Sequence, residues 1–155
     1  MHLYETHLPV ADTKISESFY REVVGLPFAH RDTKRDIVFL WADERQKGMI
    51  GLWGARTGYG RRNNVLTLCH LAFAVSLEQL QRVIGQLIEC KIKTRSFEGN
   101  VTREPGVIGW MPSAQIYFRD PDGHSLEFIT LLPDPPDPNF VGTYTQWKDR
   151  TRPRT

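Results

Sequence analysis

Two histidines and one glutamate carry the side chains in this chain that are best suited to bind a metal ion. His7 opens the segment HLPVAD, His70 opens the similar segment HLAFAV, and Glu127 lies in DPDGHSLEF. Two imidazoles and one carboxylate that reach a divalent ion from matching strand positions leave other coordination positions open. An open site implies catalysis or ligand binding rather than a purely structural metal.

These residues lie in two half-chains whose predicted elements follow the same order. In each half an alternating strand is followed by an amphipathic helix and then by short apolar strands. Because a strand turns successive side chains to opposite faces, His7 and His70 can both face a cleft while their neighbours face the helices. The expected strands are 3–10, 37–41 and 49–53 in the first half, and 65–75, 114–118 and 124–131 in the second. Further extended chain is expected after 26–28 in the first half and at 91–97 in the second.

The two helices are recognised by their caps and their apolar spacing. The first follows Asp12 or Thr13 and is expected to bury Ile15, Phe19 and Val23. The second follows Ser76 and carries apolar residues at core spacing. Each half therefore predicts a β-α-β-β-β module.

Two such modules predict an α+β fold in which paired modules form a cupped mixed sheet around a shared cleft, as one compact domain. The expected segments are a first module at 1–54, a glycine-rich polar linker at 55–64 and a second module at 65–132. The remaining residues, 133–155, are expected to leave the domain as an extended arm, because four prolines lie between positions 133 and 138.

Composition restricts the kinds of partner. The chain has 155 residues and a net charge of +2, so nothing favours nucleic acid. Its two cysteines, Cys69 and Cys90, have neither zinc-finger spacing nor a pattern that indicates a disulfide framework. No apolar run approaches membrane-spanning length, and no signal-peptide pattern opens the chain. The expectation is a cytoplasmic protein that acts on a small molecule and not on a membrane.

Each candidate ligand also has a simpler interpretation, as a buried histidine bonded within the core or as a glutamate paired with an arginine. Glu127 lies among apolar residues, where a carboxylate is costly without a partner, and a cation supplies one. The joint occurrence of all three residues favours a divalent metal, namely Mn, Fe(II), Zn or Ni. The position of the first half that aligns with Glu127 is Gly51, which offers no ligand, and Glu5 is a weaker fourth candidate.

Several aromatic and basic side chains near the expected cleft are candidates for contact with the substrate. Aromatic residues on strands also pack in cores, so a core role is the alternative for each aromatic residue. The candidates are Trp41, Trp53, Trp110, Tyr117 and Arg119.

Four segments resemble the vicinal oxygen chelate superfamily, which includes glyoxalase I, fosfomycin-resistance enzymes, extradiol dioxygenases and bleomycin-binding proteins. They are HLPVAD, SFYREVVGLPF, HLAFAV and IYFRDPDGHSLEFI, and the resemblance extends over roughly 3–132. It implies paired modules and a divalent ion on His7, His70 and Glu127 that acts as a Lewis acid on a chelating substrate. It also implies a homodimer in which modules can be exchanged between chains.

Departures from the family pattern keep the reaction open. Glyoxalase I enzymes carry a fourth ligand where this chain has Gly51, and glutathione-using fosfomycin enzymes carry a threonine where it has Pro9. No further histidine is placed as in the dioxygenases. The leading hypothesis is a metal-dependent enzyme, with Glu127 also catalytic, that performs lyase or isomerase chemistry, epoxide opening or dioxygenation on a small oxygen-rich substrate. The alternative is a non-catalytic drug- or metabolite-binding protein of the bleomycin-resistance kind.

Overall fold

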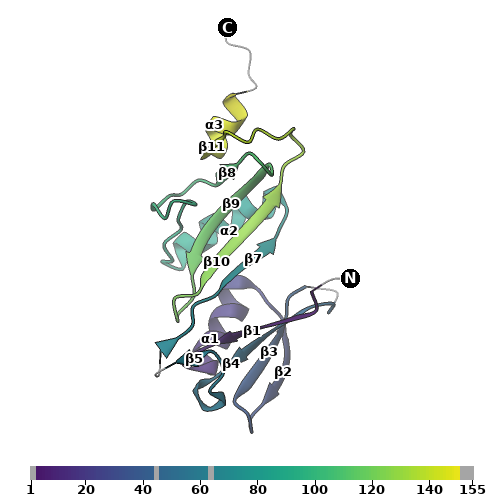
Figure 1. Ribbon diagram of the computed structural model, residues 1–155, viewed down its shortest axis with the longest axis vertical. Coiled ribbons are helices and arrows are strands. Elements are labelled where there is room, and N and C mark those ends of the chain that lie inside the picture. Colours follow the sequence, from purple (N-terminus) through teal and green to yellow (C-terminus); the bar gives the residue numbers. More distant parts are fainter. Residues whose placement is uncertain (1–2, 44–45, 63–64, 151–155) are drawn as a thin grey trace. The chain divides into compact units, whose positions relative to one another are not determined.

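The computed structural model describes residues 3–43, 46–62 and 65–150 of the chain. The chain forms two compact units (Figure 1). The first unit comprises Met1–Cys69 and Asp120–His124, and the second comprises His70–Arg119 and Ser125–Thr155. Each unit has its own sheet and its own covering helix.

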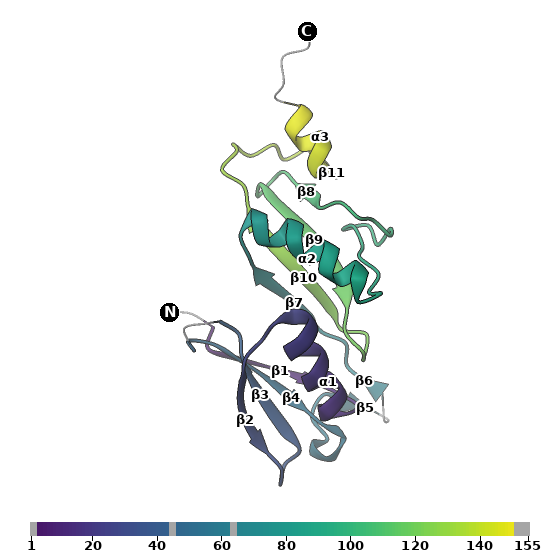
Figure 2. The ribbon, with the colours of Figure 1, turned by 180° about the vertical axis from the view of Figure 1, so that it is seen from behind.

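The first unit is built on a four-stranded mixed sheet in the order β1-β4-β3-β2. Strand β1 is parallel to β4, and the other neighbours are antiparallel. Helix α1 covers one face of this sheet (Figure 2). The strands are β1 (Glu5–Pro9), β2 (Phe28–Asp32), β3 (Ile37–Trp41) and β4 (Met49–Trp53), with a small hairpin of β5 (Arg61–Arg62) and β6 (Val65–Leu66).

Helix α1 (Thr13–Phe19) begins where the sequence predicts, because the Asp12 side chain accepts hydrogen bonds from the first backbone N–H groups of the helix. It continues as one π-helical turn, η1 (Tyr20–Val24). Gly25 then ends the helix in the left-handed region, at a φ of 87°.

The prediction that Ile15, Phe19 and Val23 form the buried stripe of this helix is wrong. Ile15 is exposed, and the other two are only half-buried. The buried side chains carry hydroxyls, which can be buried because aspartates accept their hydrogens. These bonds join Thr13 to Asp36 (3.0 Å), Ser16 to Asp122 (3.2 Å) and Tyr20 to Asp120 (2.9 Å).

The second unit is built on a five-stranded mixed sheet in the order β11-β8-β9-β10-β7. Strand β7 is parallel to β10, and the other neighbours are antiparallel. Helix α2 (Leu77–Glu89) has a capping box at Ser76 and buries Leu80, Ile84 and Leu87. The strands are β7 (His70–Ala74), β8 (Gly106–Ile108), β9 (Ser113–Arg119), β10 (Ser125–Leu131) and β11 (Val141–Thr143).

The tail differs from the extended arm that its prolines predict. After the proline-rich stretch, β11 pairs with the edge strand β8, and helix α3 (Tyr144–Asp149) follows from a capping box at Thr143. Trp147 of this helix is fully buried, and its ring lies 4.9 Å from that of Phe140. The burial of this indole and the added strand hydrogen bonds make 141–149 part of the second unit.

Each unit contains the predicted β-α-β-β-β order and a mixed sheet, so the paired modules and the α+β class are confirmed. The apolar strands 37–41 and 49–53 lie where the sequence predicts them. No helix in the described ranges is both long and apolar enough to cross a membrane.

Candidate functional site

His70 and Glu127 meet in the second unit. His70 begins β7 and pairs in register with Ser125, two residues before Glu127 on the neighbouring strand β10. The imidazole Nε2 donates a hydrogen bond of 3.0 Å to the Glu127 carboxylate. Glu127 is 6% exposed, whereas the side chain of His70 is 50% exposed. The pair thus presents a half-exposed imidazole beside a buried carboxylate.

Tyr117 completes this cluster from the third strand. It lies opposite Glu127 on β9, and its hydroxyl donates a hydrogen bond to the carboxylate. Burial, followed by the charge of Glu127, raises the pKa of the Tyr117 hydroxyl above its ordinary value. The hydroxyl therefore stays protonated near neutral pH and remains a donor. The Tyr117 ring lies 6.1 Å from His70 and 6.4 Å from Phe97.

Two polar residues on the same face of β9 were not predicted. Ser113 and Gln115 alternate with buried apolar residues and so share a face with Tyr117. Gln115 is 1% exposed, and within the described ranges its amide oxygen and nitrogen have no hydrogen-bond partner. The buried Ser113 hydroxyl likewise has no hydrogen-bond partner among the residues that the structure describes. The signal in the sequence was a glutamine inside an otherwise apolar strand.

His7 lies in the first unit, on β1, within a different set of neighbours. Its Nε2 donates a hydrogen bond of 2.6 Å to the carboxylate of Glu5, which is two residues earlier on the same strand and the same face. Its ring packs against the indole of Trp53, with ring centres 4.7 Å apart. The exposed ring of Tyr59 lies 5.6 Å from His7 and 5.0 Å from Trp53.

Gly51 lies beneath this cluster, and the space beside it is filled. A Cβ atom at this position would lie 2.8 Å from the His7 ring and 2.9 Å from the indole nitrogen of Trp53. The sequence predicts a ligand vacancy at Gly51 that is open to substrate. Gly51 indeed provides no ligand, but the space beside it is occupied by the His7 imidazole and the Trp53 indole and is not open to substrate.

Strand register also changes the comparison of the two halves. Gly51 pairs with Phe39 on β3, as Glu127 pairs with Tyr117 on β9. With Gly51 and Glu127 aligned, the position equivalent to His70 is Glu5, because Glu5 pairs with the residue two before Gly51. His7 then aligns with Ala72. The two histidines are therefore not at equivalent register positions.

The structure thus brings the predicted ligands together as pairs, His70 with Glu127 and His7 with Glu5. Within residues 3–43, 46–62 and 65–150, no group of three or more His, Cys, Asp or Glu side chains is arranged to hold a metal. The triad of His7, His70 and Glu127 stays a prediction.

The other predicted substrate-contacting residues lie in different surroundings. Trp41 ends β3 in the first unit and is half-buried, and Trp110 is exposed in the turn before β9. Arg119 ends β9 and pairs with Ser125, which also pairs with His70, so Arg119 shares a row of the sheet with His70.

His124, in the turn after β9, has a structural role. Its Nδ1 accepts a hydrogen bond from the backbone N–H of Cys69 (3.0 Å), and its Nε2 donates to the carbonyl of Pro9 (2.8 Å). Both ring nitrogens are used within the first unit and the residue is fully buried, so His124 is not a ligand.

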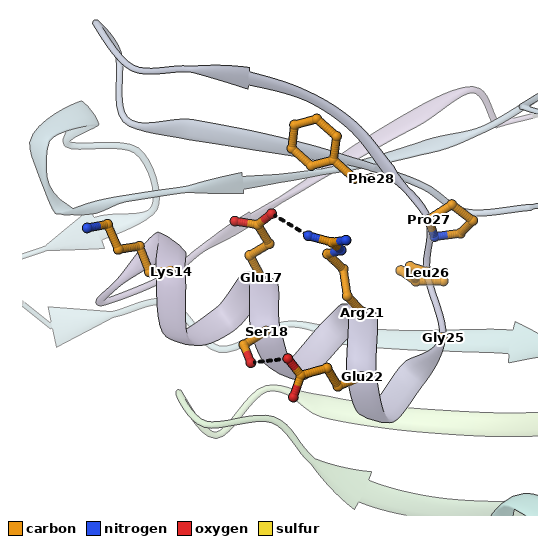
Figure 3. Close-up of a pocket in the computed structure, with 9 residues that line it drawn as sticks. All are labelled: Lys14, Glu17, Ser18, Arg21, Glu22, Gly25, Leu26, Pro27 and Phe28. Atoms are coloured by element: carbon orange, nitrogen blue, oxygen red, sulfur yellow. Dashed lines mark hydrogen bonds and ion pairs between the residues drawn. The ribbon is translucent and has the colours of Figure 1, made fainter.

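Hollows outside these clusters lie in both units. In the first unit, one of about 640 Å³ lies along α1 and η1 and contains none of the predicted site residues (Figure 3). Two of the charged side chains that line it, Glu17 and Arg21, form an ion pair (3.2 Å). In the second unit, a hollow of about 420 Å³ lies between 96–107 and 141–146. Phe97 lines it and also contacts Tyr117, so this hollow adjoins the surroundings of Glu127.

Comparison with known proteins identifies the family. The Glyoxalase/Bleomycin resistance protein/Dioxygenase superfamily matches residues 2–128. A lactoylglutathione lyase of Escherichia coli O157:H7 is 28% identical over 142 residues, which cover 83% of this chain and 92% of that protein. A lactoylglutathione lyase of Arabidopsis thaliana is 27% identical over 135 residues, covering 81% of this chain, but the match spans only 43% of that longer protein.

A solved structure agrees with these matches. An integron cassette protein from the mobile metagenome of the Halifax Harbour sewage outfall superposes with a TM-score of 0.67 at 26% identity, over 84% of this chain and 98% of that one. The paired modules, the DPDGH turn and the family match lead to one conclusion. This chain belongs to the glyoxalase/bleomycin resistance protein/dioxygenase superfamily.

Proposed function

We propose that the protein is a divalent-metal-dependent enzyme that acts on a small, oxygen-rich substrate. The observation that carries the proposal is the pair of Glu127 and His70, a buried carboxylate bonded to an accessible imidazole. Nitrogen and carboxylate donors of this kind suit Mn, Fe(II), Zn or Ni. The ion, when bound, would polarise chelated substrate oxygens as a Lewis acid.

The first half supplies the remaining protein donors in this proposal. His7 is the donor that the sequence favours, and Glu5 is supported by its register position, which matches that of His70. The hydrogen bond between His7 and Glu5 would let whichever of them does not bind the ion orient the one that does. We propose that His7, His70 and Glu127 bind the ion, with Glu5 as a further donor.

Glu127 is also the proposed catalytic residue. Its carboxylate, which Tyr117 and His70 hold in place by hydrogen bonds, would take a proton from the substrate and return it. Tyr117 and Arg119 would bind the substrate from β9. Trp41, Trp53 and Trp110 would contribute apolar surface.

The reaction class within the superfamily is proposed as lyase or isomerase chemistry, epoxide opening or dioxygenation. The curated relatives are lactoylglutathione lyases, which favours the first class. Against that specific reaction, Gly51 supplies no fourth ligand, and His7 and Trp53 fill the space where one would stand. We therefore expect little lactoylglutathione lyase activity.

The protein is further proposed to act in the cytoplasm as a homodimer. Exchange of modules between chains would let His7 of one chain join His70 and Glu127 of its partner. Sedimentation analysis at several concentrations tests the dimer. Mixing His7→Ala with Glu127→Gln chains tests the exchange, because only exchanged sites would be restored to full donor sets.

Calorimetric titration of metal-free protein with Mn, Fe(II), Zn and Ni tests which residues bind the ion. We expect Glu127→Gln and His70→Ala to weaken binding most. A large loss in His7→Ala but not in Glu5→Gln would assign His7 as the donor of the first half, and the reverse would assign Glu5. Equal affinity in all four variants and in the wild type would overturn the proposal.

A second candidate function is non-catalytic binding of a drug or metabolite. The aromatic rings gathered around Trp53 favour it. Ligand binding that persists unchanged in a His70→Ala/Glu127→Ala variant, which keeps the rings around Trp53, together with the absence of any metal-dependent turnover, would favour binding over catalysis.

A further inference from the structure

Three rings of the first unit form a continuous surface, which we call the aromatic platform (His7, Trp53 and Tyr59). Their centres lie 4.7 to 5.6 Å apart, with tilted or edge-on packing, within the range of favourable aromatic pairs. Tyr59 is 41% exposed, while His7 and Trp53 are half-buried. Ring surface therefore remains accessible to solvent.

Glycines and a turn hold the platform in place. Gly51 lets the His7 ring and the Trp53 indole lie directly on the strand, since a Cβ atom would come within 3 Å of both. Tyr59 follows the short helix η2 (Ala55–Thr57), and its N–H donates to the Thr57 side chain. Gly60 comes next in the left-handed region and packs closely on Pro9. The rings are thus fixed before any ligand arrives.

The exposed part of Trp53 is flat carbon surface. Its indole nitrogen is buried, so the half-buried side chain presents carbon atoms and no polar atom to solvent. The carboxylate of Glu5, bonded to His7, places a negative charge beside the His7 ring. A negatively charged ligand would be repelled at this edge of the platform, whereas a neutral ring would not.

We infer that the aromatic platform binds the neutral, planar aromatic part of a ligand by stacking. The inference deepens the proposed function by assigning an aromatic substrate class. It rests on the proposed function only in that the substrate's oxygens would bind the metal ion while its ring stacks on the platform. Stacking on Trp53 and Tyr59 needs no metal. The platform therefore distinguishes a flat ring from a saturated ring of the same size.

The test uses metal-free protein and two matched probes, 2-naphthol and its saturated counterpart decahydro-2-naphthol, in ligand-detected NMR titrations. We expect the planar probe to bind about tenfold more tightly than the saturated one. Trp53→Leu and Tyr59→Leu should each remove most of that preference. Phe28→Leu, which changes an exposed aromatic residue of the first unit that lies outside the platform, is the matched control and should keep it.

Equal binding of the two probes, or an unchanged preference in Tyr59→Leu, would overturn the inference. Tyr59 is exposed in a loop, so that variant remains informative if Trp53→Leu does not fold. Because no metal is present, failure of the proposed metal site leaves this result unaffected. A protein that prefers 2-naphthol but binds no divalent ion would keep the platform and lose the proposed enzyme.

Discussion

At the scale of single residues, Gly51 shows how a position without a ligand side chain is used in this fold. The absence of a ligand there is readable from the sequence, but the reason for glycine is visible only in three dimensions. His7 reaches it from the parallel strand β1, and Trp53 reaches it from two residues along β4. The residue that provides no ligand is therefore the same residue that leaves room for the two rings.

Gly51→Ala should accordingly lower the free energy of unfolding by about 1–3 kcal/mol, because the new methyl group overlaps both rings. Gly51→Glu should be at least as destabilising and should not create lactoylglutathione lyase activity. Gly48→Ala is the control, since its neighbours lie 3.6 Å or more away. Urea unfolding measures all three, and a Gly51→Ala protein as stable as Gly48→Ala would contradict this account.

Gln115 leads to the opposite expectation for stability. A buried amide without partners is costly, so Gln115→Met, which keeps the shape and removes the polar atoms, should raise the free energy of unfolding by about 1–2 kcal/mol. Gln86→Met, on the exposed face of α2, should change it little. Destabilisation by Gln115→Met would mean that the amide has a partner after all, such as an ordered water.

At the scale of elements, the DPDGH turn and helix α1 are joined through buried aspartates. Burial raises the pKa of the Asp120 carboxyl above its ordinary value, against the lowering effect of His124 and of the Tyr20 hydrogen bond. As the pH rises, the unfolded chain loses this proton before the folded chain does. The contribution of Asp120 to stability therefore falls between the ordinary and the raised pKa.

Asp120→Asn removes this titration and keeps a side-chain oxygen for the backbone N–H groups of Asp122 and His124. The wild type should lose stability relative to Asp120→Asn as the pH rises from about 4 to about 7. Urea unfolding across that range measures the difference. Parallel curves for the two proteins would show that Asp120 has no raised pKa.

The C-terminal strand and helix are the element that the sequence did not predict. Because Trp147 is 1% exposed, Trp147→Ala should cost about 3–5 kcal/mol of unfolding free energy. Trp110→Ala, at an exposed tryptophan of the same unit, should cost about 0.5 kcal/mol or less. If both variants unfold at the same denaturant concentration, the tail is not part of the packed unit.

At the scale of the whole molecule, the sequence predicted the order of elements in both modules, because strand alternation and helix caps are local signals. It predicted His70 and Glu127 as ligands of one ion, which stays a prediction; the structure joins them by a hydrogen bond between neighbouring parallel strands. The equivalence of Glu5 with His70 depends on the register between β1 and β4, which tertiary packing sets. Strand β11 was likewise not predicted, because it follows a proline-rich stretch and its hydrogen bonds are made with β8, far from it in the sequence.

Glu127 and His70 are proposed to bind a divalent ion, and metal analysis of the purified protein decides whether they do. Inductively coupled plasma mass spectrometry should find close to one Mn, Fe, Zn or Ni ion per chain in the wild type. Glu127→Gln should lose most of it, whereas Glu89→Gln, an exposed carboxylate at the end of α2, should retain it. A wild type without metal after supplementation, or a Glu127→Gln protein with full metal content, would contradict the account.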